Sequence, residues 1–309
     1  MKEDQPSATA FLIARALLFL SRDPETAPLI PPAAAEAYGW LVDATAPLSG
    51  RLARAAGGGP LRGIGYAFER LTIPGITLHY AVRKRYLEDA CRRALMEGVS
   101  QVLVLGAGYD TLALRLHREY PDALFVECDH PATQRMKRRV LEERACAGPN
   151  LQLLPVDLGR RSLGEVIASL PEYRPSADTL LIAEGLTMYL QPRDMDALFA
   201  FLRENTGPGS RFAFTFMEPQ RNGEIDFPGS TPLVRPWLRL VGEPFTWGIR
   251  RDALAAYVEE RGFRLEELAT ADTLRERYLA PAGLAGRRLA FGEHIAVARR
   301  AAESPQALC

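Results

Sequence analysis

Apolar and polar residues follow two patterns along the chain: short apolar runs, and longer stretches whose apolar residues recur at helical spacing. A short unbroken apolar run is typical of a strand that is buried on both faces of a parallel sheet. Such runs, or alternating ones, predict strands at 101–105, 123–129, 151–156, 179–183, 211–217, 265–269 and 294–298. Helical spacing predicts helices at 77–96, 112–120, 133–145 and 163–170, from 192 onward, and at 251–261. Strands that alternate with helices predict an α/β fold with a doubly wound, mostly parallel seven-stranded sheet.

The residues before this alternating part predict a different kind of structure. Residues 1–76 are interpreted as a helical cap on the ligand edge of the sheet, with helices at 8–21 and 33–44 and a glycine-rich loop at 57–60. Residues 77–309 are interpreted as the ligand-binding core. Within the core, residues 219–250 are rich in proline, glycine and aromatic residues, which indicates either a substrate lid or a loop packed on the core.

The strand at 101–105 runs directly into the turn Gly106-Ala107-Gly108, and the next helix follows at once. Backbone N–H groups at the positive end of that helix face whatever lies above Gly106. A glycine turn also serves tight strand-to-helix packing, so it does not specify a ligand alone. The dinucleotide fingerprint requires a third glycine, and this chain has Thr111 there. The turn therefore suits a nucleotide ligand without a pyrophosphate and argues against a nicotinamide dehydrogenase.

Acidic residues follow the next predicted strands. Asp129 ends one strand, and Asp157 and Glu184 come directly after two others. In a doubly wound sheet the ligand lies across the carboxyl ends of the strands, and Asp129 falls where a ribose-binding carboxylate is expected. These positions outline an adenosine site. We expect the ribose on Asp129, the adenine near Asp157 and Leu158, and an amino-acid tail near Gly106 and Glu184.

Arg83 lies near the middle of the apolar face of the helix predicted at 77–96, whereas Lys84 and Glu88 fall towards the other side. Burying an unpaired charge costs roughly several kcal/mol. Arg83 therefore needs an anionic partner. The partner is either a core acid or, as we prefer, the carboxylate of a bound ligand.

The overall charge gives no reason to expect nucleic acid or an acidic membrane surface as a partner, because 38 basic and 38 acidic residues cancel. The basic cluster at 135–144, which includes Lys137, is interpreted as a solvated helix face. With 309 residues, 47% of them hydrophobic, the chain can bury a full core. The composition is that of an ordinary soluble globular protein.

Cysteines 91, 128, 146 and 309 have no short paired spacing. This argues against a zinc site or a disulfide framework and fits a reducing cytoplasm. The apolar run at 8–20 is too short to span a bilayer and is interpreted as a buried helix.

Together these motifs resemble the leucine carboxyl methyltransferase family and its bacterial relatives among polyketide and other small-molecule O-methyltransferases. The resemblance covers residues 77–218, and its matching pieces are Arg83 and the segments 101–111, 126–131, 157–158 and 181–190. It implies a Rossmann-like class I methyltransferase fold with S-adenosylmethionine as cofactor. It places Arg83 on the cofactor carboxylate, Gly106, Ala107 and Gly108 beneath the cofactor, Asp129 on the ribose, Asp157 and Leu158 at the adenine, and Glu184 near the amino group. Tyr189 matches a tyrosine that lines the substrate side, and Arg15 corresponds loosely to a cap lysine that helps hold the carboxylate.

The acceptor is the open question. A carboxylate acceptor, with a pKa near ~4, is ionised at neutral pH, whereas a phenol, with a pKa of about 10, needs a base. His130 is a candidate base because it follows Asp129, although its context equally indicates a helix start. His79 and His117 are interpreted as surface or packing residues. The lack of a clear base favours a carboxyl acceptor.

Two other functions stay open from the sequence. The chain could bind S-adenosylmethionine without transferring a methyl group. It could also act as a nicotinamide dehydrogenase, although the glycine turn argues against that function. The chain departs from the protein-modifying members of the family over residues 219–250, so a small acid or phenol fits better than a protein C-terminus.

Overall fold

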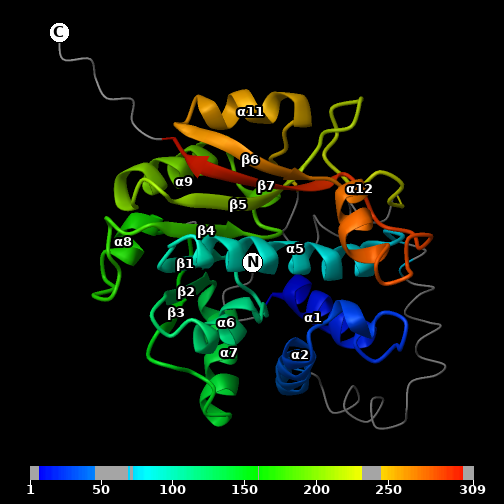
Figure 1. Cartoon of the computed structure of the whole chain (residues 1–309), viewed down its shortest axis with the longest axis horizontal. Helices are drawn as coiled ribbons and strands as arrows, with labels where there is room; N and C mark the ends of the chain where they lie inside the picture. Colours follow the sequence, from blue (N-terminus) through cyan, green and yellow to red (C-terminus); the bar gives the residue numbers. More distant parts are fainter. Residues whose placement is uncertain (1–6, 46–68, 70–71, 159, 232–244, 302–309) are drawn as a thin grey trace.

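The structure is a computed structural model that describes residues 7–45, 69, 72–158, 160–231 and 245–301. Seven strands form one sheet in the order β3-β2-β1-β4-β5-β7-β6 (Figure 1). The strands are β1 (Gln101–Leu105), β2 (Leu124–Asp129), β3 (Leu151–Pro155), β4 (Thr179–Ala183), β5 (Arg211–Met217), β6 (Phe263–Ala269) and β7 (Glu293–Arg300). Neighbouring strands from β3 to β5 pair in parallel, and β7 is antiparallel to both of its neighbours. The predicted doubly wound, mostly parallel seven-stranded sheet is confirmed.

Helices cover both faces of this sheet because each inner strand is apolar on both sides. Val102 and Val104 of β1 join one buried cluster, whereas Leu103 and Leu105 join another on the opposite face. The first face carries α5 (Ile76–Met96), α6 (Leu112–Glu119), α7 (Pro131–Glu143) and α12 (Ala271–Leu274). The second face carries α8 (Leu163–Ile167), α9 (Pro192–Asn205) and α11 (Arg251–Glu259). Figure 1 shows α5 crossing in front of the sheet.

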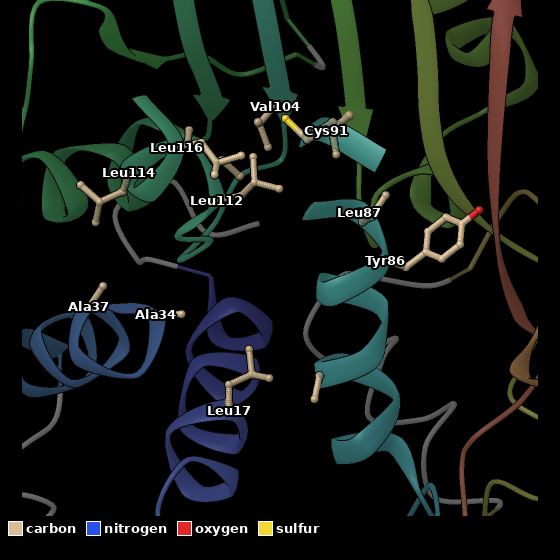
Figure 2. Close-up of a cluster of buried hydrophobic side chains, with 14 of the residues drawn as sticks. Leu17, Ala34, Ala37, Tyr86, Leu87, Cys91, Val104, Leu112, Leu114 and Leu116 are labelled. Atoms are coloured by element: carbon tan, nitrogen blue, oxygen red, sulfur yellow. The ribbon is translucent and has the colours of Figure 1, made fainter. Parts of the chain in front are cut away.

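Within the part of the chain that the structure describes, two α-helices precede α5 and pack on the same face of the sheet. They are α1 (Ala8–Leu20) and α2 (Pro32–Thr45). Leu17 of α1 and Ala34 of α2 belong to the buried cluster that also contains Leu112 and Leu116 of α6 (Figure 2). The glycine-rich loop expected at 57–60 lies outside the described residues. The division of the chain at residue 76 stays a prediction, and the described helices of the expected cap share the core of α5 and α6.

The described parts of the expected lid, 219–231 and 245–250, contain neither helix nor strand and pack on the core. Phe227 and Phe245 belong to a third cluster together with Met188 and Met217. Trp247 instead joins the cluster beneath α9 and α11. Residues 232–244 of the expected lid lie outside the described residues. Within the described part of the chain, no helix is both long and apolar enough to cross a membrane.

Candidate functional site

The glycine turn after β1 has the backbone that its sequence predicts. Gly106 and Gly108 have φ values of +61° and +51°, a region that glycine adopts without strain. A Cβ atom on Gly106 would lie 3.2 Å from Leu186, and one on Gly108 would lie 3.0 Å from the Cβ of Ala10 in α1. Ala107 between them is buried. The turn therefore packs against the first turn of α1 and the chain that follows β4. A side chain at either glycine would be strained by the positive φ and would press on these neighbours.

Asp129 ends β2 beside this turn and is fixed by two backbone donors. Its Oδ2 accepts from the N–H of Gly108 at 2.6 Å, and its Oδ1 accepts from the N–H of His130 at 2.6 Å. Burial raises the pKa of the Asp129 carboxyl, and these two hydrogen bonds oppose that effect. Each carboxylate oxygen keeps a second lone pair. Nδ1 of His130 accepts from the N–H of Ala132 at 3.4 Å and so caps α7, which is the helix-start role that the sequence left open.

Asp157 and Leu158 follow β3 at the same edge of the sheet. The N–H of Val156 donates to the backbone oxygen of Asp129 at 2.8 Å, which holds the ends of β2 and β3 together. Asp157 and Leu158 are both half-buried, and Leu158 packs against the apolar cluster on the second face. The sheet order therefore brings Gly106, Asp129 and these two residues to one edge.

Arg83 of α5 is buried, with 3% of its surface exposed, and has two acidic partners. Its Nε donates to Oε1 of Glu184 at 2.9 Å, and its Nη1 donates to both carboxylate oxygens of Glu293, at 2.9 and 2.8 Å. The core-acid alternative from the sequence is therefore realised in this structure. Nη2 makes no hydrogen bond to the residues that the structure describes. It lies beside Gly185, where a Cβ atom would be 3.4 Å away.

Lys84 extends the same network, and the expectation that it falls towards the other side of its helix was wrong. Its Nζ donates to Oδ2 of Asp110 at 2.6 Å and to Oε2 of Glu184 at 3.0 Å. Burial would raise the pKa of the Asp110 carboxyl, but the ammonium of Lys84 outweighs burial and holds that pKa well below its usual range. Lys84 thus contacts the sheet edge at Glu184, directly after β4, and at Asp110, in the loop between β1 and α6.

Lys137 was also misjudged as part of a solvated helix face. Its side chain is fully buried, and its Nζ donates to Oε2 of Glu127 and to the backbone oxygen of Asp110, both at 2.5 Å. Its basic neighbours in the sequence give no sign of this burial, since Arg139 on the same helix is 62% exposed. Lys137 thereby ties α7 to β2 and to the loop that follows the glycine turn.

Glu293 and His79 were missed as site residues. Glu293 opens β7 and is fully buried, and its Oε2 lies 2.7 Å from Nε2 of the fully buried His79 in α5. Burial would raise the pKa of Glu293, but the guanidinium of Arg83 lowers it to about 2. Because β7 is antiparallel, its first residue lies at the edge where the parallel strands end. An acid that begins an antiparallel strand is thus equivalent to one that ends a parallel strand.

Tyr189 lies in a short 3-10 helix, η2 (Thr187–Tyr189), after β4. Its ring centroid is 5.5 Å from that of Phe245. Thr215 of β5 fixes this turn, because its Oγ1 accepts from the N–H of Gly185 at 2.8 Å and its backbone oxygen accepts from the Thr187 hydroxyl. We call the surrounding apolar group the aromatic cluster. Its buried members are Ile76, Met188, Met217, Phe227 and Ala290, with Tyr80, Tyr189 and Phe245 packed against them.

Arg15 is not among the residues that the structure brings together. Its side chain is exposed on α1, with the guanidinium carbon 5.6 Å from the ring centroid of Phe11. The cysteines that the structure describes, Cys91, Cys128 and Cys146, are buried free thiols.

The sheet order, the glycine turn after β1 and the acids at the neighbouring strand ends define a Rossmann-like protein of the class I methyltransferase fold. A solved structure described as "a putative methyltransferase from Thermobifida fusca YX" has this fold, with a TM-score of 0.53, 18% identity and 97% of each chain covered. The profile described as leucine carboxyl methyltransferase matches residues 20–203, more than half of this chain. The chain belongs to the leucine carboxyl methyltransferase family.

Two relatives carry the name "Putative S-adenosyl-L-methionine-dependent methyltransferase". The chain is 29% identical over 205 residues to one from Mycolicibacterium smegmatis, which covers 65% of this chain and 66% of that protein. It is 33% identical over 151 residues to one from Mycolicibacterium gilvum, which covers 48% of this chain and 47% of that protein. The chain thus spans about half to two thirds of the length of these relatives.

Proposed function

We propose that this chain is an S-adenosylmethionine-dependent O-methyltransferase that methylates a carboxylate or a phenol of a small molecule. The observation that carries the proposal is the group of fixed polar residues beside the glycine turn. Asp129 is held there by two backbone donors, and Arg83 keeps its Nη2 donors next to Gly185. Family membership and the names of the relatives support S-adenosylmethionine as the ligand for this group.

The residues fit the cofactor in chemical type. Gly106, Ala107 and Gly108 add little side-chain bulk at the end of β1, and the N–H of Gly108 holds Asp129 in place. Asp129 would accept hydrogen bonds from the ribose hydroxyls, and Asp157 and Leu158 would flank the adenine. The Nη2 donors of Arg83 would bind the carboxylate of the methionine part. Glu184, already an acceptor for Arg83 and Lys84, would accept from its ammonium group.

When bound, the cofactor supplies a sulfonium-linked methyl group that is open to displacement by an oxygen nucleophile. The chain's own contribution is to hold that methyl group in line with the acceptor, and alignment of this kind can supply roughly 7–11 kcal/mol of the barrier. Tyr189 and the aromatic cluster would position the acceptor, with residues 219–250 as its lid. A carboxylate acceptor would need no base, whereas a phenol would. We expect a small-molecule partner and a cytoplasmic location.

Calorimetric titration of S-adenosylmethionine and S-adenosylhomocysteine tests the proposal. We expect the wild type to bind both ligands, and we expect Arg83→Ala and Asp129→Ala each to weaken binding tenfold or more, which is about 1.4 kcal/mol. Arg93→Ala is the matched control, because Arg93 lies on the same helix but pairs with Glu267 at 2.7 Å, away from the glycine turn. Failure of the wild type to bind would overturn the proposal. Binding without methyl transfer to any acid or phenol would leave a binding protein instead.

A further inference from the structure

The buried pair of His79 and Glu293 determines which nitrogen of the imidazole carries a proton. Oε2 of Glu293 lies 2.7 Å from Nε2 of His79, and Nη1 of Arg83 donates to the same carboxylate. A carboxylate held by a guanidinium is ionised and can only accept hydrogen bonds. Nε2 of a neutral His79 must therefore be the donor. This leaves a lone pair on Nδ1.

Nδ1 of His79 is buried and has no hydrogen-bond partner among the residues that the structure describes. Buried polar atoms are nearly always paired, so an unpaired one requires an explanation such as a catalytic role or a missing partner. The carboxylate-imidazole pair gives one explanation. An imidazole whose Nε2 is bound to a carboxylate has its other nitrogen available as a base, and the carboxylate stabilises the cation that forms.

The position of His79 connects it with the side of the site where Tyr189 lies. The ring of His79 meets that of Phe227 nearly edge-on, with centroids 6.2 Å apart and an interplanar angle of 77°. The ring of Phe227 is 6.3 Å from that of Phe245, which in turn is 5.5 Å from that of Tyr189. His79 therefore borders the aromatic cluster on one side and, through Glu293, the Arg83 network on the other.

We propose that His79 is the general base of the reaction and that the acceptor is a hydroxyl compound such as a phenol. The inference rests on the proposed function and narrows it. The acceptor oxygen forms a bond to the methyl carbon while the bond from that carbon to the sulfonium sulfur breaks, and the electron pair stays on sulfur as a thioether. The hydroxyl proton moves to Nδ1 of His79, and Glu293 stabilises the imidazolium that results.

His294 offers an internal comparison, because it too has a glutamate partner and an unpaired, buried Nδ1. Its Nε2 lies 3.2 Å from Glu218. Its ring packs 5.5 Å from that of Phe216, which belongs to the cluster on the second face of the sheet. Glu218 is also bound by Arg251 at 2.8 Å and is 26% exposed. His294 thus has the same kind of pair without a contact to the aromatic cluster, which makes it the matched control for His79.

Nitrogen NMR of the protein labelled at histidine tests the proposal without knowledge of the natural acceptor. The resonances of His79 and His294 are assigned from the signals lost in His79→Gln and in His294→Gln. Phenol and anisole are then titrated into the wild-type complex with S-adenosylhomocysteine. We expect phenol to shift the Nδ1 resonance of His79 through a new hydrogen bond, and anisole, which has no O–H, to leave it in place. The resonances of His294 should respond to neither compound.

The outcomes separate this inference from the proposed function. Calorimetry first establishes whether S-adenosylhomocysteine binds, and a protein that does not bind it refutes both. If it binds but phenol leaves His79 unchanged up to its solubility limit, or shifts it no more than anisole does, the general-base role is wrong while the cofactor site stands. A resting tautomer with the proton on Nδ1 would also overturn the inference. The titrations themselves use wild-type protein, and the two variants serve only to assign the histidine resonances.

Discussion

The two sides of the sheet's carboxyl edge are built from different interactions. The side that we propose binds the cofactor, called the cofactor side, is a chain of buried ion pairs in which Arg83, Glu184 and Lys84 each bind two partners. The side that we propose holds the acceptor, called the acceptor side, is the aromatic cluster, where rings meet at centroid distances of 5.5–6.3 Å. Hydrogen bonds between charged groups are directional and hold one geometry, whereas ring packing fills space and tolerates changes of shape. The cofactor side is thus suited to a constant ligand, and the acceptor side can change without disturbing it.

The largest effect should follow from removing a cation beneath the cofactor side. In Lys137→Met the buried carboxylate of Glu127 loses its partner, and breaking a buried pair in this way costs about 3–5 kcal/mol. Denaturant unfolding measures the loss. Arg139→Ala is the control, because that side chain is 62% exposed on the same helix, and its change should stay within about 0.5 kcal/mol. Equal losses in the two variants would show that the buried Lys137 contributes no more to stability than an exposed residue.

A second test uses acid. Burial would raise the pKa of the Glu293 carboxyl, but the guanidinium of Arg83 outweighs burial and lowers it from 4.5 to about 2. Glu293 therefore stabilises the folded state above pH 4.5, and this contribution is lost as the pH falls towards 2. We expect the wild type to lose about 3 kcal/mol more than Glu293→Gln across that window. Unfolding curves collected from pH 5 to pH 2 measure the difference. If the free energies of unfolding of the two proteins changed equally with pH, the view that ionised groups stabilise the cofactor side would be contradicted.

The smallest effect should come from the acceptor side. Tyr189→Ala removes one ring from the aromatic cluster. The ring pair contributes about 1 kcal/mol beyond the area that it buries, and because Tyr189 is only half-buried we expect the total loss of stability to stay below that of Lys137→Met. Its affinity for S-adenosylhomocysteine should stay within about twofold of the wild type, below 0.5 kcal/mol. Unfolding and calorimetry on the same sample check both values. If Tyr189→Ala weakened cofactor binding as much as Arg83→Ala, the two sides could not be regarded as separate.

The sequence predicted the fold and one half of the network for a common reason. The strands are unbroken apolar runs, and Gly106, Asp129 and Glu184 directly follow or end such runs, so their shared edge follows from the parallel order of the strands. The other half depends on side chains that meet across distant elements. Placing Glu293 at the site requires knowledge that β7 runs antiparallel. Predicting the burial of Lys137 requires the rotation of α7 relative to β2, which the periodicity of the sequence does not give.

The roles of His79 and Lys84 were hidden for a further reason. Both lie on α5 near Arg83, and a helical wheel distinguishes a buried face from an exposed one but not which buried charges meet acids. Their partners, Glu293 and Asp110, come from a strand and a loop on different parts of the sheet edge. His79 was therefore visible in the sequence as a histidine, but its pairing with Glu293 was not.

The position of Glu293 on β7 also affects how the protein is made. Arg83 and Glu293 are 210 residues apart, so at a synthesis rate of roughly 5–20 residues per second Arg83 leaves the ribosome about 10–40 s before its partner exists. β6 is made earlier than β7 but pairs with β7 alone, so it too must wait. The nascent chain therefore holds a charged helix face and an unpaired strand during the last stage of translation, and insertion of β7 between β5 and β6 completes both at once.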